Sequence, residues 1–89
     1  MEIADQAPSE PALTEYDRAH LVIYLRLLDA EASGASWEDA ARLLLNTDPA
    51  KARDAARLRY ETHAARARWM ASEGYLDLLR HPRGRDQGR

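Results

Sequence analysis

The 89-residue sequence contains no cysteine, which excludes disulfide bonds and metal sites built on thiolates. Its three histidines, His20, His63 and His81, have no HxxxH or HExxH spacing, so we expect no metal site. The longest unbroken apolar stretch, residues 21–25, is far too short to span a membrane, and the N-terminus has no cationic signal-peptide region. These absences predict a soluble cytoplasmic protein that has no cofactor and no small-molecule ligand.

Residues that favour β-strands are also scarce. Valine and isoleucine together number three, and no segment alternates apolar and polar positions with β-branched residues. A chain of this length buries only about 60 to 65% of its unfolded surface, which is enough for one modest core. We therefore expect one all-α domain. An enzyme is not expected, because Ser36 has no histidine placed to activate it and no glycine-rich phosphate loop is present.

Capping signals divide the middle of the chain into helices. Thr14 and Asp17 form a potential capping box for a first helix over residues 15–32, and Gly34 stands where a left-handed residue would end it. Ser36 caps a second, short helix, whose expected inward side chains are Trp37, Ala40, Ala41, Leu43 and Leu44. Asp48 and Pro49 are placed as N-cap and first residue of a long third helix within residues 50–72.

The third helix has a buried stripe of residues three or four positions apart, namely Ala56, Tyr60, Ala64, Ala67 and Met70. Gly74 ends it, and an apolar segment over residues 75–79 forms a closing turn. Residues 1–13 and 81–89 lack a periodic apolar pattern and are expected to be disordered, which leaves a domain over residues 14–80. A short helix, an extended turn and a long helix, braced by the first helix, predict a three- to four-helix variant of the helix-turn-helix fold.

The first helix has more apolar surface than a small domain needs. On a helical wheel Leu21, Tyr24, Leu25 and Leu28 form a core-facing stripe, and a second apolar arc contains Ile23 and Leu27. Either the third helix and the closing turn cover the second arc, or it stays exposed as a site for another protein. Trp69 is expected to be half core and half surface. The predicted partner-binding residues are His20, Ile23, Tyr24, Leu27, Trp69 and Tyr75.

An alternative candidate site, for binding DNA, lies at the start of the third helix. Lys51, Arg53 and Arg57 stand where a recognition helix would meet the major groove. The net charge of −2 argues against general nucleic-acid binding, although the second half of the chain is basic. Residues 1–48 carry ten acidic and three basic side chains, whereas residues 49–89 carry five acidic and ten basic ones. Glu61 is spaced to pair with Arg57, and the third helix has no Asn or Gln to read adenine.

Several short motifs resemble a known family. They lie at residues 16–21, 24–30, 34–37, 40–42, 48–49, 63, 65–70, 74–75 and 78–80, and the segment 65–70 reads Ala-Arg-Ala-Arg-Trp-Met. Together they resemble the RovC-like domain family of proteobacterial mobile elements, over nearly all of residues 16–80. The resemblance implies an extended-turn helix-turn-helix fold.

The resemblance also implies two kinds of member. Activators carry this domain after a separate N-terminal domain and present a basic surface to DNA. Stand-alone members resemble antiactivators, which occupy the N-terminal domain of a transcriptional activator of the same mobile element and block excision and transfer of an integrative and conjugative element. Some also capture a LuxR-type quorum-sensing regulator. The short lead-in and the acidic first two helices favour the antiactivator, and a DNA-binding regulator is the alternative.

Overall fold

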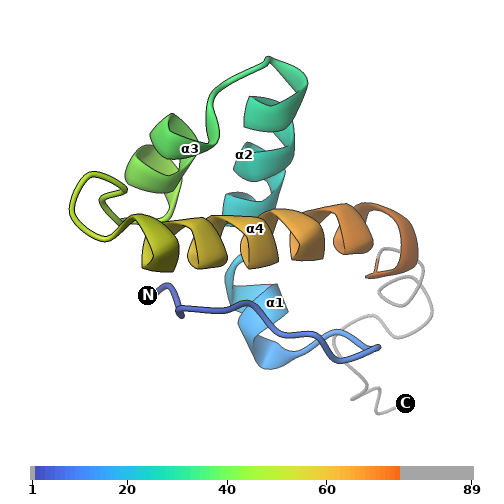
Figure 1. Ribbon diagram of the computed structural model, residues 1–89. Helices are drawn as coiled ribbons and strands as arrows, with labels where there is room; N and C mark the ends of the chain where they lie inside the picture. The colour runs from blue at the N-terminus through green and yellow to red at the C-terminus, as the bar shows by residue number, and fades with distance from the viewer. Residues whose placement is uncertain (1, 75–89) are drawn as a thin grey trace, which may run out of the picture.

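The computed structural model of the protein describes residues 2–74, and all regular structure in this range is helical. Four α-helices, α1 (Glu15–Ala19), α2 (Leu21–Ala32), α3 (Trp37–Leu44) and α4 (Arg53–Trp69), are followed by the π-helical turn η1 (Met70–Gly74). In Figure 1 the long α4 runs between α2 and α3 above it and α1 with the N-terminal arm, residues 2–13, below it. The predicted all-α fold is confirmed, with α3, an extended turn over residues 45–52, and α4 as its helix-turn-helix.

Three of the predicted helix ends are present in atomic detail. The Thr14 hydroxyl accepts a hydrogen bond from the Asp17 N–H, and the Asp17 carboxylate accepts one from the Thr14 N–H, so the capping box begins α1. The Ser36 hydroxyl accepts a hydrogen bond from the Asp39 N–H at the start of α3. Gly34 has a φ of 81°, and its N–H donates to the Glu31 carbonyl, which completes the left-handed end of α2.

The predicted first helix is two helices, because the backbone leaves the helical region at His20 (φ −116°, ψ 23°). The His20 N–H approaches the carbonyls of both Tyr16 and Asp17, which tightens the last turn of α1. His20 Nδ1 also donates a hydrogen bond to the Tyr16 carbonyl oxygen at 2.7 Å. A histidine that bonds to its own preceding turn therefore separates α1 from α2, and the prediction of one continuous helix over residues 15–32 was wrong.

The predicted start of the third helix was also wrong. Asp48 does not cap α4: its carboxylate accepts a hydrogen bond from the Ala50 N–H, and its carbonyl accepts from Lys51 and Ala52, which closes a separate turn. Ala52 then extends the chain (φ −142°, ψ 74°) before α4 begins at Arg53. At the other end of the loop Asn46 has a positive φ of 54°, a conformation that asparagine tolerates better than most residues.

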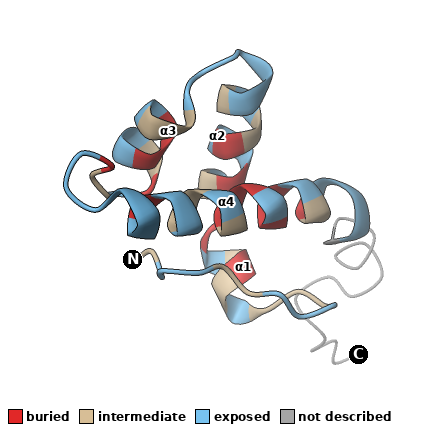
Figure 2. Cartoon of the chain, viewed as in Figure 1, coloured by how far each residue is buried: buried red, intermediate tan, exposed pale blue. Residues whose placement is uncertain are grey.

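The core lies where α2 and α3 meet α4, as the buried positions in Figure 2 show. The predicted stripe of α4 is confirmed, because Ala56, Ala64, Ala67 and Met70 are buried and Tyr60 is half-buried. These alanines let α2 and α3 approach α4 closely. On α2 the buried side chains are Tyr24, from the predicted core-facing stripe, and Leu27, from the second apolar arc.

Two leucines that were expected in the core lie outside it. The side chain of Leu25 is 65% exposed and that of Leu43 is 82% exposed, whereas Leu27, a predicted partner-binding residue, is only 3% exposed. For Leu25 the physical reason is the position of α4. This helix covers the face of α2 centred on Tyr24 and Leu27 and leaves Leu25 at the edge of the contact.

The N-terminal arm lies against α1 and α4, although the sequence predicts disorder there. The Ala4 N–H donates to the Tyr16 hydroxyl, the Ala7 N–H donates to the Thr62 hydroxyl, and Arg59 pairs with Asp5 at 2.9 Å. The arm is thus held mainly by side chains that bond to its backbone, for which an apolar pattern is no guide. The predicted closing turn over residues 75–79 and the tail over residues 81–89 lie outside the described residues.

Candidate interaction surfaces

A buried ion pair joins α1, α4 and the N-terminal arm. The Asp17 side chain is fully buried and that of Arg66 is 4% exposed. Arg66 Nε donates to Asp17 Oδ1 at 3.0 Å, Arg66 Nη2 donates to Oδ2 at 2.6 Å, and the Tyr24 hydroxyl donates to Oδ1 at 2.7 Å. Arg66 also donates to the carbonyls of Glu10 and Ala12. Every charge in this cluster therefore has a partner, and the cluster is part of the scaffold.

The pKa values of the cluster follow from this geometry. Burial raises the pKa of the Asp17 carboxyl, but the hydrogen bonds from Arg66, the Thr14 N–H and Tyr24 outweigh burial and hold that pKa below its usual value. The bond to Asp17 raises the pKa of Arg66, and burial followed by the same carboxylate raises the pKa of Tyr24. The pair is therefore charged, and Tyr24 is a neutral donor at neutral pH.

A second buried polar group, His63, connects α4 to α1. Its Nδ1 donates to the Arg59 carbonyl at 2.7 Å, and its Nε2 faces the Tyr16 hydroxyl at 2.6 Å. Burial lowers the pKa of His63, although the bond to the Arg59 carbonyl opposes this effect, and the nearby His20 and Arg59 lower it further. A neutral ring with the proton on Nδ1 satisfies both contacts, because Nε2 then accepts from Tyr16.

We expect His63 to make the protein less stable in mildly acidic solution. The unfolded chain binds a proton at His63 near the usual pKa of about 6.5, but the folded chain binds it only at lower pH. The free energy of unfolding should therefore fall as the pH is lowered from 7 to 5. In His63→Gln, which cannot titrate, urea unfolding over the same range should show a smaller fall. An equal pH dependence in both proteins would contradict this assignment.

The structure places the predicted partner-binding residues in three different environments. His20, Tyr24 and Leu27 are buried, so the prediction that they meet a partner directly was wrong: the contact with α4 and the N-terminal arm covers them. Ile23 is half-buried against the core. Trp69 is half-buried as expected, with its ring 3.9 Å from the guanidinium carbon of Arg66. Tyr75 lies outside the described residues.

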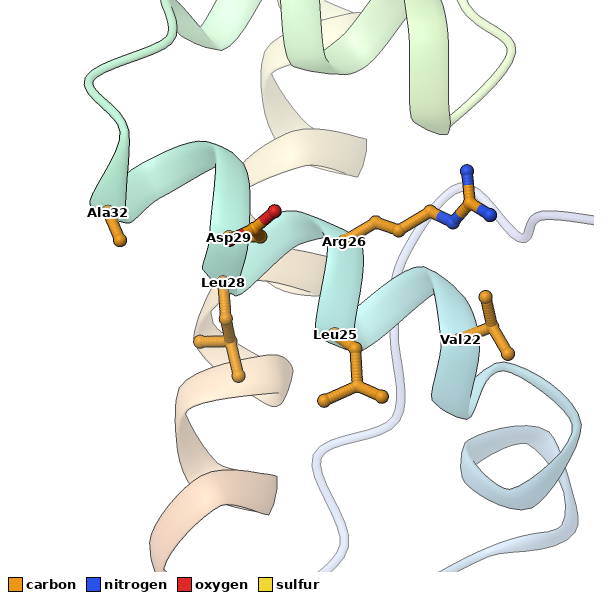
Figure 3. Close-up of a pocket in the computed structure, with 6 residues that line it drawn as sticks. All are labelled: Val22, Leu25, Arg26, Leu28, Asp29 and Ala32. Carbon is orange, nitrogen blue, oxygen red and sulfur yellow. The ribbon is translucent and has the colours of Figure 1, made fainter.

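The exposed apolar surface of α2 lies on its other side. The side chains of Val22 and Leu25 are 60% and 65% exposed, one turn apart. Figure 3 shows Leu25 and Leu28 pointing to the same side of α2, with Val22 at one end of the row and Ala32 at the other. We call Val22, Leu25 and Leu28 the α2 face. Sequence reasoning missed it as a surface because Val22 belongs to neither apolar arc of the wheel and Leu25 falls in the expected core stripe.

The predicted DNA-binding residues Lys51, Arg53 and Arg57 are exposed around the start of α4, but their neighbours engage the two arginines. Arg53 pairs with Glu38 at 3.3 Å and Arg57 pairs with Glu61 at 2.6 Å, the second pair as predicted. Both guanidinium carbons lie about 5 Å from the centre of the Trp37 ring, at 5.0 and 4.9 Å. Residues 37–61, which include the whole turn, carry five acidic and five basic side chains.

Other classes of site find no support in residues 2–74. No group of three His, Asp or Glu side chains in this range is arranged to hold a metal ion. No helix in the same range is long and apolar enough to cross a membrane.

The fold therefore defines a small all-helical domain of the helix-turn-helix class, with an extended turn. The family model of the RovC DNA-binding domain, described as a T6SS transcription factor DNA-binding domain, matches residues 2–80, and the chain belongs to this family. The match begins within the N-terminal arm, so the family domain includes the arm that α1 and α4 hold. A search of curated proteins found no match to the chain.

Proposed function

We propose that this protein is an antiactivator that binds the N-terminal domain of a transcriptional activator of the same mobile element. It would take the place of the activator's own homologous domain and so block activation of conjugative-element excision and transfer. The observation that carries this proposal is the α2 face, on which two large apolar side chains, Val22 and Leu25, are more than half exposed. Single exposed apolar residues are ordinary, but a row of them along one helix is typical of a binding surface.

The antiactivator would compete with the activator's own homologous domain, and this competition sets the affinity that it needs. The activator's own copy is held near its partner at an effective concentration of around a millimolar, so the antiactivator must bind tightly or be abundant. Burial of the α2 face supplies the affinity, because removing apolar surface from water is the main driving force of association. The acidic first half of the chain, with ten acidic and three basic side chains in residues 1–48, adds steering toward a basic partner. A LuxR-type regulator is a second proposed partner for the same face, and both partners imply a cytoplasmic site of action.

DNA binding through α4 is the second candidate function, favoured by the family description and by the exposed Lys51, Arg53 and Arg57. The equal number of acidic and basic side chains in residues 37–61, around the start of α4, opposes it. An acidic side chain beside a phosphate offsets the counterion release that a neighbouring arginine provides, and Glu38 and Glu61 already neutralise the two arginines.

Two titrations of the full chain separate the candidates. We expect the activator's N-terminal domain, added in isothermal calorimetry, to bind with a Kd in the micromolar range or below, and the element's promoter DNA to show only weak, nonspecific shifts in gels at 50 and 200 mM salt. The matched variant Arg53→Ala/Arg57→Ala should bind the activator domain as the wild type does. Sequence-specific DNA binding that this variant loses, together with no binding to the activator domain, would replace the antiactivator with a DNA-binding regulator.

A further inference from the structure

The α2 face carries one guanidinium and one carboxylate beside its apolar side chains. Arg26 and Asp29 line an open surface hollow together with Val22, Leu25, Leu28 and Ala32 (Figure 3). Both charged side chains are exposed, and neither forms an ion pair with another residue in the described range 2–74. An apolar surface that carries one charge of each sign suits a partner that has the same two charges in exchanged positions.

The two edges of the α2 face differ in polarity. Arg26 and Asp29 lie on the edge toward α3, because both also border a hollow that α3 lines. Leu28 lies on the edge toward α4, because it borders an apolar groove that Met70 and Ala71 line. The face therefore has a charged edge on the side of α3 and an apolar edge on the side of α4.

Two-fold symmetry decides which edges meet when two copies pack through this face. If the two α2 helices are antiparallel, the axis is perpendicular to them, and each edge lies beside the same edge of the second copy. If they are parallel, the axis runs along them, and each edge lies beside the opposite one. A parallel pair would therefore place Arg26 beside Leu28, whereas an antiparallel pair places the charged edges together.

The positions of the two charges along α2 suit the antiparallel pair. The point midway between Arg26 and Asp29 lies close to the middle of α2, which runs from Leu21 to Ala32. A crossing at this point brings Arg26 of each copy opposite Asp29 of the other, and it also brings Leu25 of each copy within one turn of Leu28 of the other. Two equal ion pairs and one shared apolar centre then form together.

We propose that two copies of the protein associate through the α2 face, with the α2 helices antiparallel and with Arg26 of each copy paired to Asp29 of the other. The apolar centre supplies the affinity, and the two ion pairs set the direction of the helices. One helix face is a small interface, so we expect a weak dimer with a dissociation constant of about 10 to 100 µM. This dimer covers the surface assigned to the activator domain, but the inference concerns the protein alone and does not rest on the proposed function.

Sedimentation velocity of the full chain tests whether the dimer forms. Over a range of about 1 to 500 µM, the wild type should change from monomer to dimer, because association follows mass action. Leu25→Asp should remain a monomer over the whole range, because it places two carboxylates in the apolar centre of the interface. Its circular dichroism should equal that of the wild type, since the side chain of Leu25 is mostly exposed.

Exchanging the two charges tests the arrangement. Arg26→Asp alone and Asp29→Arg alone each place like charges together at both contacts, so each should raise the dissociation constant by ~10-fold or more. The double variant Arg26→Asp/Asp29→Arg restores opposite charges at both contacts, and so does an equimolar mixture of the two single variants. Both should dimerise as the wild type does. Lys51→Asp is the matched control, because it changes the net charge as Arg26→Asp does, at an exposed residue of the turn before α4.

Three results would overturn the inference. The first is a wild type that stays monomeric at the highest concentration, which leaves the α2 face to a different protein. The second is a dimer that Lys51→Asp weakens as much as Arg26→Asp does. The third is a dimer that neither the double variant nor the mixture restores. Binding of the activator domain is measured separately by the calorimetric titration, so failure of one proposal is distinguishable from failure of the other.

Discussion

Arg66→Met is expected to lower the free energy of unfolding by about 3 to 5 kcal/mol, the usual cost of removing one partner of a buried ion pair. The substitution leaves the fully buried Asp17 carboxylate without its bidentate donor, and it leaves the carbonyls of Glu10 and Ala12 without the guanidinium. Small domains are stable by about 5 to 15 kcal/mol, so the loss is a large fraction of the total. Urea unfolding followed by circular dichroism measures it.

Arg68→Met is the matched control for this prediction. Arg68 is also on α4 and also pairs with a carboxylate, that of Glu31, but both side chains are about half exposed. Exposed pairs contribute about 0 to 1 kcal/mol, so this variant should unfold almost as the wild type does. The double variant Asp17→Asn/Arg66→Met should lose less than the sum of the two single losses, because the unpaired charge is gone. Equal losses of unfolding free energy in Arg66→Met and Arg68→Met would show that the buried pair contributes no more to stability than the exposed pair.

Signals that act within one turn of the chain were readable from the sequence. The capping box of Thr14 and Asp17, the Ser36 cap and the left-handed Gly34 depend on residues at most three positions apart, and all three are present. The alanine stripe of α4 was also readable, because its period is that of the helix itself. Where a local signal has two uses, as at Asp48, the sequence does not distinguish a turn from a helix cap.

Contacts between distant segments were not readable. Asp17 and Arg66 are 49 positions apart, and each alone is an ordinary surface charge of its helix. The N-terminal arm was misjudged for the same reason, since the side chains that hold its backbone, among them Arg59, Thr62 and Arg66, come from α4. A wheel shows how many faces of a helix are apolar but not which of them a neighbour covers, so it could not decide between Leu25 and Leu27.

Because Leu25 is exposed and Leu27 is buried, a test of partner binding has to substitute a different residue from those that the sequence predicts. Leu27→Asp, a substitution at one of the predicted partner-binding residues, would bury a charge in the core and unfold the protein, so a loss of binding would carry no information about the surface. A useful substitution has to alter the α2 face and leave the packing of α2 on α4 intact. Leu25 satisfies both conditions better than any residue in the predicted set, because it is 65% exposed.

Leu25→Asp is accordingly expected to weaken binding of the activator's N-terminal domain by ~100-fold or more, with little change in helicity or in unfolding. The central residues of an interface contribute about 2 to 4 kcal/mol each, and a carboxylate placed there adds a desolvation cost.

Leu43→Asp is the matched control, because Leu43 is 82% exposed on α3 and should tolerate the same charge without effect on binding. Calorimetry with the purified domain measures both variants, and a reporter driven by the activator measures the consequence: repression should be lost in Leu25→Asp and kept in Leu43→Asp. If Leu25→Asp binds and represses as the wild type does, the α2 face is not the site.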